Sequence, residues 1–116
     1  MKPCFFVGSA RKDIQAFPDK VKNVMGAAIQ TAQFGGKAAS AKPLKGLGSG
    51  VLEIVENHDG DTFRGVYIIR LEGAVYVLHA FKKKSVQGIK TPQKDIELVK
   101  SRIKLAEEHH AKNRNS

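Results

Sequence analysis

One stretch decides the fold: residues 63–81, which read FRGVYIIRLEGAVYVLHAF. It holds two runs rich in β-branched and aromatic residues, 63–71 and 74–81, separated only by Glu72-Gly73. Such runs around a short glycine-containing pair are typical of a β-hairpin. A third run, 51–56, precedes them across the turn-forming residues 57–61. The stretch therefore predicts three antiparallel strands joined by two hairpins.

The predicted second hairpin fixes which residues oppose one another. A two-residue loop at Glu72-Gly73 creates three opposed pairs: Arg64 and Phe81, Val66 and His79, and Ile68 and Val77. Because side chains alternate along a strand, these six residues share one face of the sheet. The other face takes a more purely apolar set: Tyr67, Ile69, Leu71, Tyr76, Leu78 and Ala80.

Helical periodicity precedes the strands. After Pro18, apolar residues recur at spacings of three and four as far as Gly35-Gly36, which predicts one long helix. Its stripe consists of Val21, Val24, Met25, Ala28, Ile29 and Ala32. Ser9 can cap a shorter helix before Pro18, since proline interrupts the pattern. The sequence therefore predicts two helices, or one kinked helix, in this region.

A further helix follows the strands. Thr91 is the expected N-cap and Pro92 the first-turn residue. The apolar stripe contains Ile96, Val99, Ile103 and Ala106, supported by Leu98 and Leu105. We expect this helix to end near His109 and residues 111–116 to fray.

The remaining segments complete the fold class. Residues 3–7 are apolar and aromatic, which suits a strand near one edge of the sheet. Residues 35–50 are rich in glycine and predict a connection without helix or strand. The order is therefore β-α-α-β-β-β-α, an α+β class, and 116 residues suit a single domain spanning 1–116.

Charge and cysteine content narrow the function. Twenty Lys and Arg against eleven Asp and Glu give a net charge of +9, concentrated in residues 36–50 and 82–104. Such an excess favours a polyanionic partner, although it also fits a solvated basic face. The lone Cys4 permits no intrachain disulfide, and zinc-ligand spacing is absent. The chain also lacks a membrane-length apolar run and a signal-peptide pattern. We expect a cytoplasmic protein without metal, cofactor or membrane partner.

The most distinctive motif is an apolar strand that runs into Lys82, Lys83 and Lys84, followed by Thr91-Pro92. Clustered ammonium groups can hold a phosphate backbone and lower one another's pKa by repulsion. A lysine perturbed in this way could accept a proton at neutral pH. The alternative is a solvated charge run at a strand end.

These motifs closely resemble the phage-derived branch of the HigB/RelE toxin family. The resemblance rests on residues 44–46, 63–67, 78–85, 91–92 and 95–98, and spans nearly the whole chain. It implies a RelE-like fold with a twisted antiparallel sheet, two N-terminal helices and a C-terminal helix. It also implies the toxin of a type II toxin–antitoxin pair that cleaves mRNA on the ribosome. A helix-turn-helix antitoxin is the implied partner.

The resemblance also implies candidate site residues. Arg64 matches a phosphate-stabilising arginine, and Arg64→Ala should then abolish growth inhibition while leaving folding intact. Lys82, Lys83 and Lys84 match the basic cluster that follows the last strand in this family. Lys83 shares the face of Arg64 if the strand continues that far. His79 is either a proton carrier or a packing residue. We expect the RNA-binding lysines to be Lys42, Lys45 and Lys90.

Two alternatives remain open. Relatives often have Glu-Leu-Arg where this chain has Glu53-Ile54-Val55, so one expected cation is missing. That loss points to a non-catalytic inhibitor of the ParE type, which acts on gyrase by binding. A basic nucleic-acid-binding module without cutting activity is the other alternative. Glu53 could orient Arg64 across the first hairpin, but an exposed strand carboxylate is the expectation.

Overall fold

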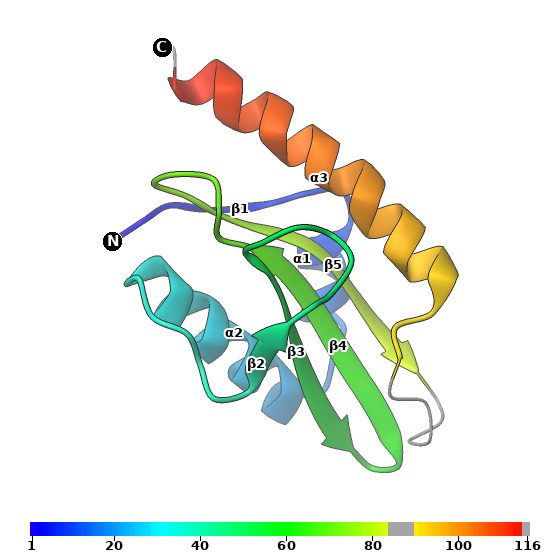
Figure 1. The fold of residues 1–116 in the computed structure, drawn as a ribbon. Coiled ribbons are helices and arrows are strands. Elements are labelled where there is room, and N and C mark those ends of the chain that lie inside the picture. Colours follow the sequence, from blue (N-terminus) through cyan, green and yellow to red (C-terminus); the bar gives the residue numbers. More distant parts are fainter. Residues whose placement is uncertain (84–89, 115–116) are drawn as a thin grey trace.

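The computed structural model describes residues 1–83 and 90–114 and has a five-stranded sheet with helices on both faces (Figure 1). The strand order is β1-β5-β4-β3-β2. The elements are β1 (Cys4–Phe6), α1 (Ala10–Gln15), α2 (Asp19–Gln33), β2 (Ala41–Pro43), β3 (Val51–His58), β4 (Asp61–Ile68), β5 (Val75–Lys83) and α3 (Gln93–Arg114). The predicted α+β class is confirmed, and the fold is compatible with a RelE-like one.

The predicted edge strand is confirmed as β1, but the sheet differs from the prediction in two ways. At one edge, β1 pairs parallel with β5, whereas all other pairs are antiparallel, so the sheet is mixed. At the other edge, β2 adds a strand inside residues 35–50, where we expected none. Its exposed Lys42 lies opposite Glu53 of β3. A three-residue strand among glycines is too short to produce a readable period, which is why the sequence did not predict it.

Two of the three predicted β4–β5 pairs are correct. Arg64 pairs with Phe81 and Val66 with His79, as expected, but Ile68 lies opposite Tyr76 instead of Val77. The register shifts next to Val66, where β5 contains one extra residue, a β-bulge. The strands end at Ile68 and begin again at Val75, so residues 69–74 connect them rather than a two-residue loop.

The bulge changes which residues share a face. Tyr76 and Leu78 pack with Ile68 in one apolar cluster, and Val77 packs with Tyr67 in the other. The predicted partition is therefore wrong for Tyr76, Val77 and Leu78, and also for Leu71, which packs against the cluster of Ile68. Period-two alternation cannot reveal a bulge, because the extra residue reverses every assignment beyond it.

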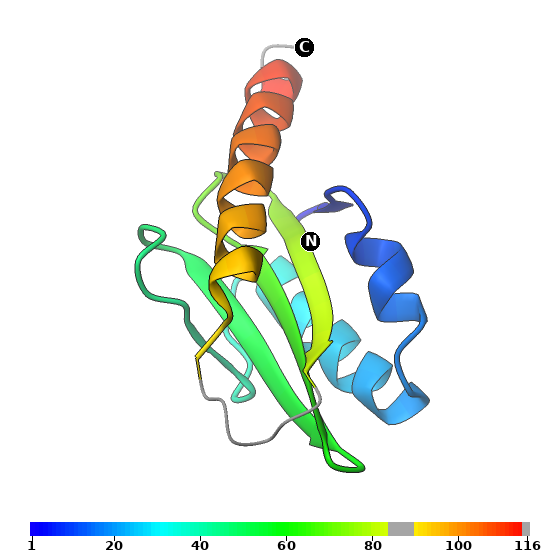
Figure 2. The same ribbon diagram turned by 90° about the vertical axis from the view of Figure 1, so that its right-hand side faces the viewer.

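Helices cover both faces of the sheet. Figure 2 shows α1 and α2 on one side and α3 on the other. The predicted α2 stripe is confirmed, with Val21, Met25, Ala28, Ile29 and Ala32 buried. Gly65 of β4 lets this helix approach closely, since a Cβ there would lie 2.7 Å from Met25 Sδ. On the opposite face, α3 buries Val99, Ile103 and Ala106, as its periodicity predicts.

Helix α3 is longer than predicted and continues through Arg114, beyond the edge of the sheet (Figure 2). Fraying over residues 111–114 is therefore wrong, and 115–116 lie outside the described residues. The helix persists because His109 Nδ1 lies 2.7 Å from Tyr76 Oη, and His110 Nε2 lies 2.7 Å from the Glu72 carbonyl oxygen. Leu105 is 52% exposed, so it does not support the buried stripe. Within residues 1–83 and 90–114, no helix combines the length and apolarity needed to cross a membrane.

Candidate functional site

A buried ion pair lies at the centre of the candidate site. Arg64 Nη1 of β4 donates to Glu53 Oε1 of β3 at 3.1 Å. The two residues are 2% and 3% exposed. The expectation that Glu53 is an exposed carboxylate is therefore wrong, and its weighed alternative, orientation of Arg64 across the hairpin, matches the contact. A charge buried to this degree is stable only with a partner, so each side chain depends on the other.

The second Glu53 oxygen connects the sheet to the segment that leads into α3. Thr91 Oγ1 donates to Glu53 Oε2 at 2.9 Å. Thr91 was predicted to be the N-cap of this helix, but α3 begins at Gln93, which places Pro92 immediately before it. The Thr91 hydroxyl group thus donates to the buried carboxylate instead of capping the helix. Capping rules consider only neighbouring residues, so they do not predict a contact between residues this far apart in sequence.

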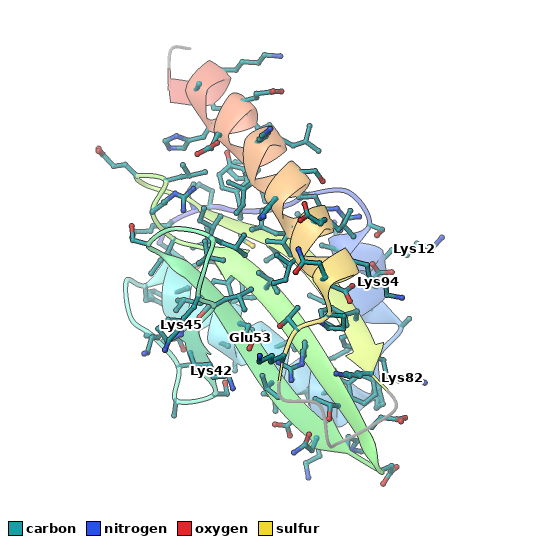
Figure 3. The ribbon with its side chains drawn as sticks, turned by 45° about the vertical axis from the view of Figure 1, so that its right-hand side comes forward. Lys12, Lys42, Lys45, Glu53, Lys82 and Lys94 are labelled. Atoms are coloured by element: carbon teal, nitrogen blue, oxygen red, sulfur yellow. The ribbon has the colours of Figure 1, made fainter. Side chains whose placement is uncertain are left out.

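A groove of about 500 Å³ lies over this pair. It is lined by Lys42, Pro43, Leu44, Lys45, Glu53, Lys90, Thr91 and Ile96. The three predicted RNA-binding lysines, Lys42, Lys45 and Lys90, therefore converge on one groove, and all three are exposed. Figure 3 shows Lys42 and Lys45 together beside Glu53. We call this the lysine groove; its role in RNA binding stays a prediction.

Arg64 differs from the groove lysines in its accessibility. It contacts Glu53, a lining residue, but the described lining of the lysine groove does not include Arg64 itself. Its guanidinium group neutralises the carboxylate, so the buried pair beneath the groove carries no net charge. In this arrangement Arg64 orients Glu53, and direct phosphate binding by Arg64 stays a prediction.

The strand-exit lysines lie beside a second, smaller hollow of about 280 Å³. Its described lining consists of Phe81, Lys82, Lys83, Pro92, Lys94 and Asp95. Strand β5 does continue to Lys83, whose Nζ donates to the Lys90 carbonyl at 3.4 Å. Lys82 Nζ lies 3.8 Å from Asp61 Oδ2. Lys84 lies outside the described residues.

His79 is buried between β5 and α3. Its Nε2 lies 2.7 Å from Asp95 Oδ1, and its Nδ1 lies 3.5 Å from Arg102 Nη1. Because a carboxylate only accepts, the Nε2–H group of His79 donates to Asp95. The ring also stacks on Phe81, with centroids 4.9 Å apart. These contacts fit the packing role weighed for His79, and its proton-transfer role stays a prediction.

Sequence reasoning missed several residues of this region. Three residues from α3 or the segment before it each contact a strand residue far away in sequence: Asp95, Arg102 and Thr91. The signal for Asp95 was its position one residue before Ile96 of the apolar stripe, which places it near the sheet. The signal for Glu53 was a lone carboxylate among apolar neighbours in a strand.

The chemistry available here is that of cations around a buried carboxylate. Exposed lysines can bind phosphate oxygens without any metal ion. Within the described ranges 1–83 and 90–114, no group of three His, Cys, Asp or Glu side chains is arranged to hold a metal ion. Cys4 lies away from both hollows on β1, and burial raises the pKa of its thiol.

Comparison with known proteins identifies the family. Residues 12–104 match the family model described as phage derived protein Gp49-like (DUF891). Searches of curated proteins and of solved structures found no significant match. The matched residues include all three groove lysines, the Glu53–Arg64 pair and both predicted strand-exit lysines of β5. The chain therefore belongs to the phage-derived Gp49-like family, a family associated with RelE/HigB-like toxins.

Proposed function

We propose that this protein is the toxin of a type II toxin–antitoxin pair and that it cleaves mRNA during translation on the ribosome. Membership of the Gp49-like family, which is associated with RelE/HigB-like toxins, supports assignment as a toxin. The observation that carries the proposal is the convergence of Lys42, Lys45 and Lys90 over the buried Glu53–Arg64 pair. These lysines come from β2, the loop after it and the segment before α3, so the fold gathers them from distant parts of the chain.

The proposed reaction needs no metal ion. The ribose 2′-oxygen attacks the adjacent phosphorus, its proton passes to a base, and the bond to the 5′-oxygen breaks as that oxygen takes up a proton. The products are a 2′,3′-cyclic phosphate and a free 5′-hydroxyl group. A base, an acid and cations for the developing phosphorane charge are required.

The candidate groups for these roles are basic. The groove lysines hold the backbone phosphates on either side of the reacting one. Lys82, Lys83, Lys84 and His79 are the candidates for proton transfer, and Arg64, the candidate phosphate-stabilising arginine, offsets the negative charge of Glu53 beneath the groove. The proposed antitoxin is a helix-turn-helix protein whose acidic segment covers Lys82 to Lys84, because opposite charges favour that contact.

Removing the groove lysines should abolish toxicity. We expect wild-type protein to arrest growth when induced in a bacterial host, and the variant Lys42→Ala/Lys45→Ala/Lys90→Ala to permit growth. Each lysine neutralises backbone charge, so the slope of log K for RNA binding against log salt concentration should also become shallower by about two. Growth curves with protein levels checked by immunoblot, and binding titrations at several salt concentrations, measure both effects.

The matched control removes the same charge elsewhere. Lys12 and Lys20 are exposed on α1 and α2, and Lys112 is exposed near the end of α3. Lys12→Ala/Lys20→Ala/Lys112→Ala should arrest growth as the wild type does. Equal toxicity of the groove variant and this control would contradict the proposed role of the groove.

A second candidate is a gyrase inhibitor of the ParE type. The observation that favours it is Val55, which lies directly opposite Arg64 in the β3–β4 register and carries no charge. The resemblance to HigB/RelE toxins implies arginine at this position, so this chain would have one fewer cation beside the buried pair. Under this alternative, arrested cells would contain gyrase–DNA cleavage complexes and intact transcripts.

A further inference from the structure

The smaller hollow differs from the lysine groove in having an aromatic wall. Phe81 of β5 and Pro92 before α3 contribute apolar surface, and Lys82, Lys83 and Lys94 surround them. Asp95, the one carboxylate among the described residues of the lining, is engaged by His79 through Oδ1. We propose that this hollow, which we call the Phe81 hollow, binds one nucleobase of single-stranded RNA stacked on the Phe81 ring. The inference rests on the proposed function, because it adds a base-binding subsite to the RNA-binding surface.

The Phe81 ring is held in place before any ligand arrives. It stacks on His79 with a centroid distance of 4.9 Å and an interplanar angle of 21°. His79 is itself fixed by Asp95 and by Arg102, whose Nη1 also donates to the Leu78 carbonyl at 2.9 Å. A ring already fixed loses little side-chain freedom when a base stacks on it. Single-stranded RNA is commonly bound in this way, by stacking bases on aromatic side chains.

The two cavities flank the same short segment of chain. Lys90 and Thr91 line the lysine groove, and Pro92 lines the Phe81 hollow. Lys83 bridges the two, because its Nζ contacts the Lys90 carbonyl oxygen. Figure 3 shows Lys42 and Lys45 on one side of Glu53 and Lys94 on the other. An RNA strand whose phosphates lie along the lysine groove can therefore place a neighbouring base in the Phe81 hollow.

Charge alone does not explain this arrangement. A surface that bound only the phosphate backbone would gain nothing from an immobilised ring among its lysines. A partner protein would be expected to bring acidic side chains to the same lysines, and its carboxylates would leave the face of the Phe81 ring unused. Ring and lysines together match a nucleotide, which carries both a π-face and a negative charge.

Replacing the ring tests the inference with the charge unchanged. The assay measures dissociation constants at low salt for a fluorescent single-stranded RNA and, by competition, for inorganic polyphosphate, which has no bases. Phe81→Leu keeps apolar bulk against His79 but removes the π-face, and Phe81→Tyr keeps the ring. We expect Phe81→Leu to weaken RNA binding about 5- to 150-fold, the loss of one stacked base. Polyphosphate binding should stay unchanged, and Phe81→Tyr should bind RNA as the wild type does.

Phe34, which is 70% exposed at the end of α2, supplies the matched control, and Phe34→Leu should bind RNA normally. Thermal unfolding of each variant verifies that it is folded. The base-binding subsite is contradicted, and the proposed function stands, if Phe81→Leu binds RNA as tightly as the wild type. The same holds if its affinities for RNA and for polyphosphate fall by the same factor. If the wild type binds neither RNA nor polyphosphate, both the subsite and the proposed RNA-binding function are contradicted.

Discussion

Replacing Arg64 with methionine should lower the free energy of unfolding by about 3–5 kcal/mol, because it leaves a buried carboxylate without its cation. Glu53 is 3% exposed and its Oε1 accepts from Arg64 Nη1 at 3.1 Å. The Thr91 hydroxyl still donates to Glu53 Oε2, but it is a neutral donor and cannot replace a full positive charge. Chemical denaturation of Arg64→Met and the wild type measures the loss.

The double variant Arg64→Met/Glu53→Met provides the internal check. Removing both charges should restore much of the lost stability, because replacing a whole buried pair with apolar groups is often close to neutral. The matched control is Lys82→Met, which breaks the exposed ion pair with Asp61 and should cost about 0–1 kcal/mol. If the double variant is less stable than Arg64→Met alone, the buried pair is not the cause of the loss.

Burial of Arg64 also corrects one expectation drawn from the sequence. We expected Arg64→Ala to abolish toxicity while leaving folding intact, as for an accessible phosphate ligand. A 2% exposed arginine that pairs with a buried carboxylate cannot be truncated without a cost in stability. Loss of toxicity in that variant would therefore have two causes, and the exposed groove lysines give a cleaner functional test.

Replacing Gly50 with alanine should lower the free energy of unfolding by about 2–5 kcal/mol. Gly50 precedes β3 with φ of 74°, a left-handed conformation that costs an alanine roughly 1–2 kcal/mol. A Cβ there would also lie 2.8 Å from Arg70 Cβ and 3.1 Å from the Arg70 nitrogen, a clash worth roughly another 1–3 kcal/mol. Denaturant titration of Gly50→Ala measures the sum.

Gly46 separates these two causes. It also has a left-handed φ, of 90°, but among the described residues, its two chain neighbours aside, no atom lies within 4 Å of the position of its Cβ. Gly46→Ala should therefore show only the backbone cost of roughly 1–2 kcal/mol. Equal losses in the two variants would mean that the close approach of Arg70 does not contribute. The approach matters for the candidate site, because Arg70 Nη1 donates to the Leu47 and Ser49 carbonyls and so fixes the loop after Lys45.

The sequence predicted the elements of this fold better than their boundaries. Apolar periodicity identified α2 and the buried stripe of α3, because each helix has one face against the sheet. It could not identify β2, which is three residues long, or the extension of α3 to Arg114. That extension depends on contacts of His109 and His110 with Tyr76 and the β4–β5 connection, which only the folded chain brings together.

The candidate site was predicted as a set of residue types and not as an arrangement. The sequence identified Lys42, Lys45 and Lys90 from their charge, but nothing in it showed that all three line one groove. From the sequence we expected Glu53 to be exposed, because a lone carboxylate in a strand usually is. In the structure Glu53 is buried, because Arg64 on the neighbouring strand β4 supplies its counterion and a paired charge can be buried.

The central claim is that this protein cuts mRNA, and mapping transcript 5′ ends after induction tests it most directly. We expect new 5′ ends within reading frames in cells that express the wild type and the control Lys12→Ala/Lys20→Ala/Lys112→Ala. These ends should be absent with Lys42→Ala/Lys45→Ala/Lys90→Ala. Growth arrest by the wild type with transcripts intact would contradict the claim and favour an inhibitor that acts by binding alone.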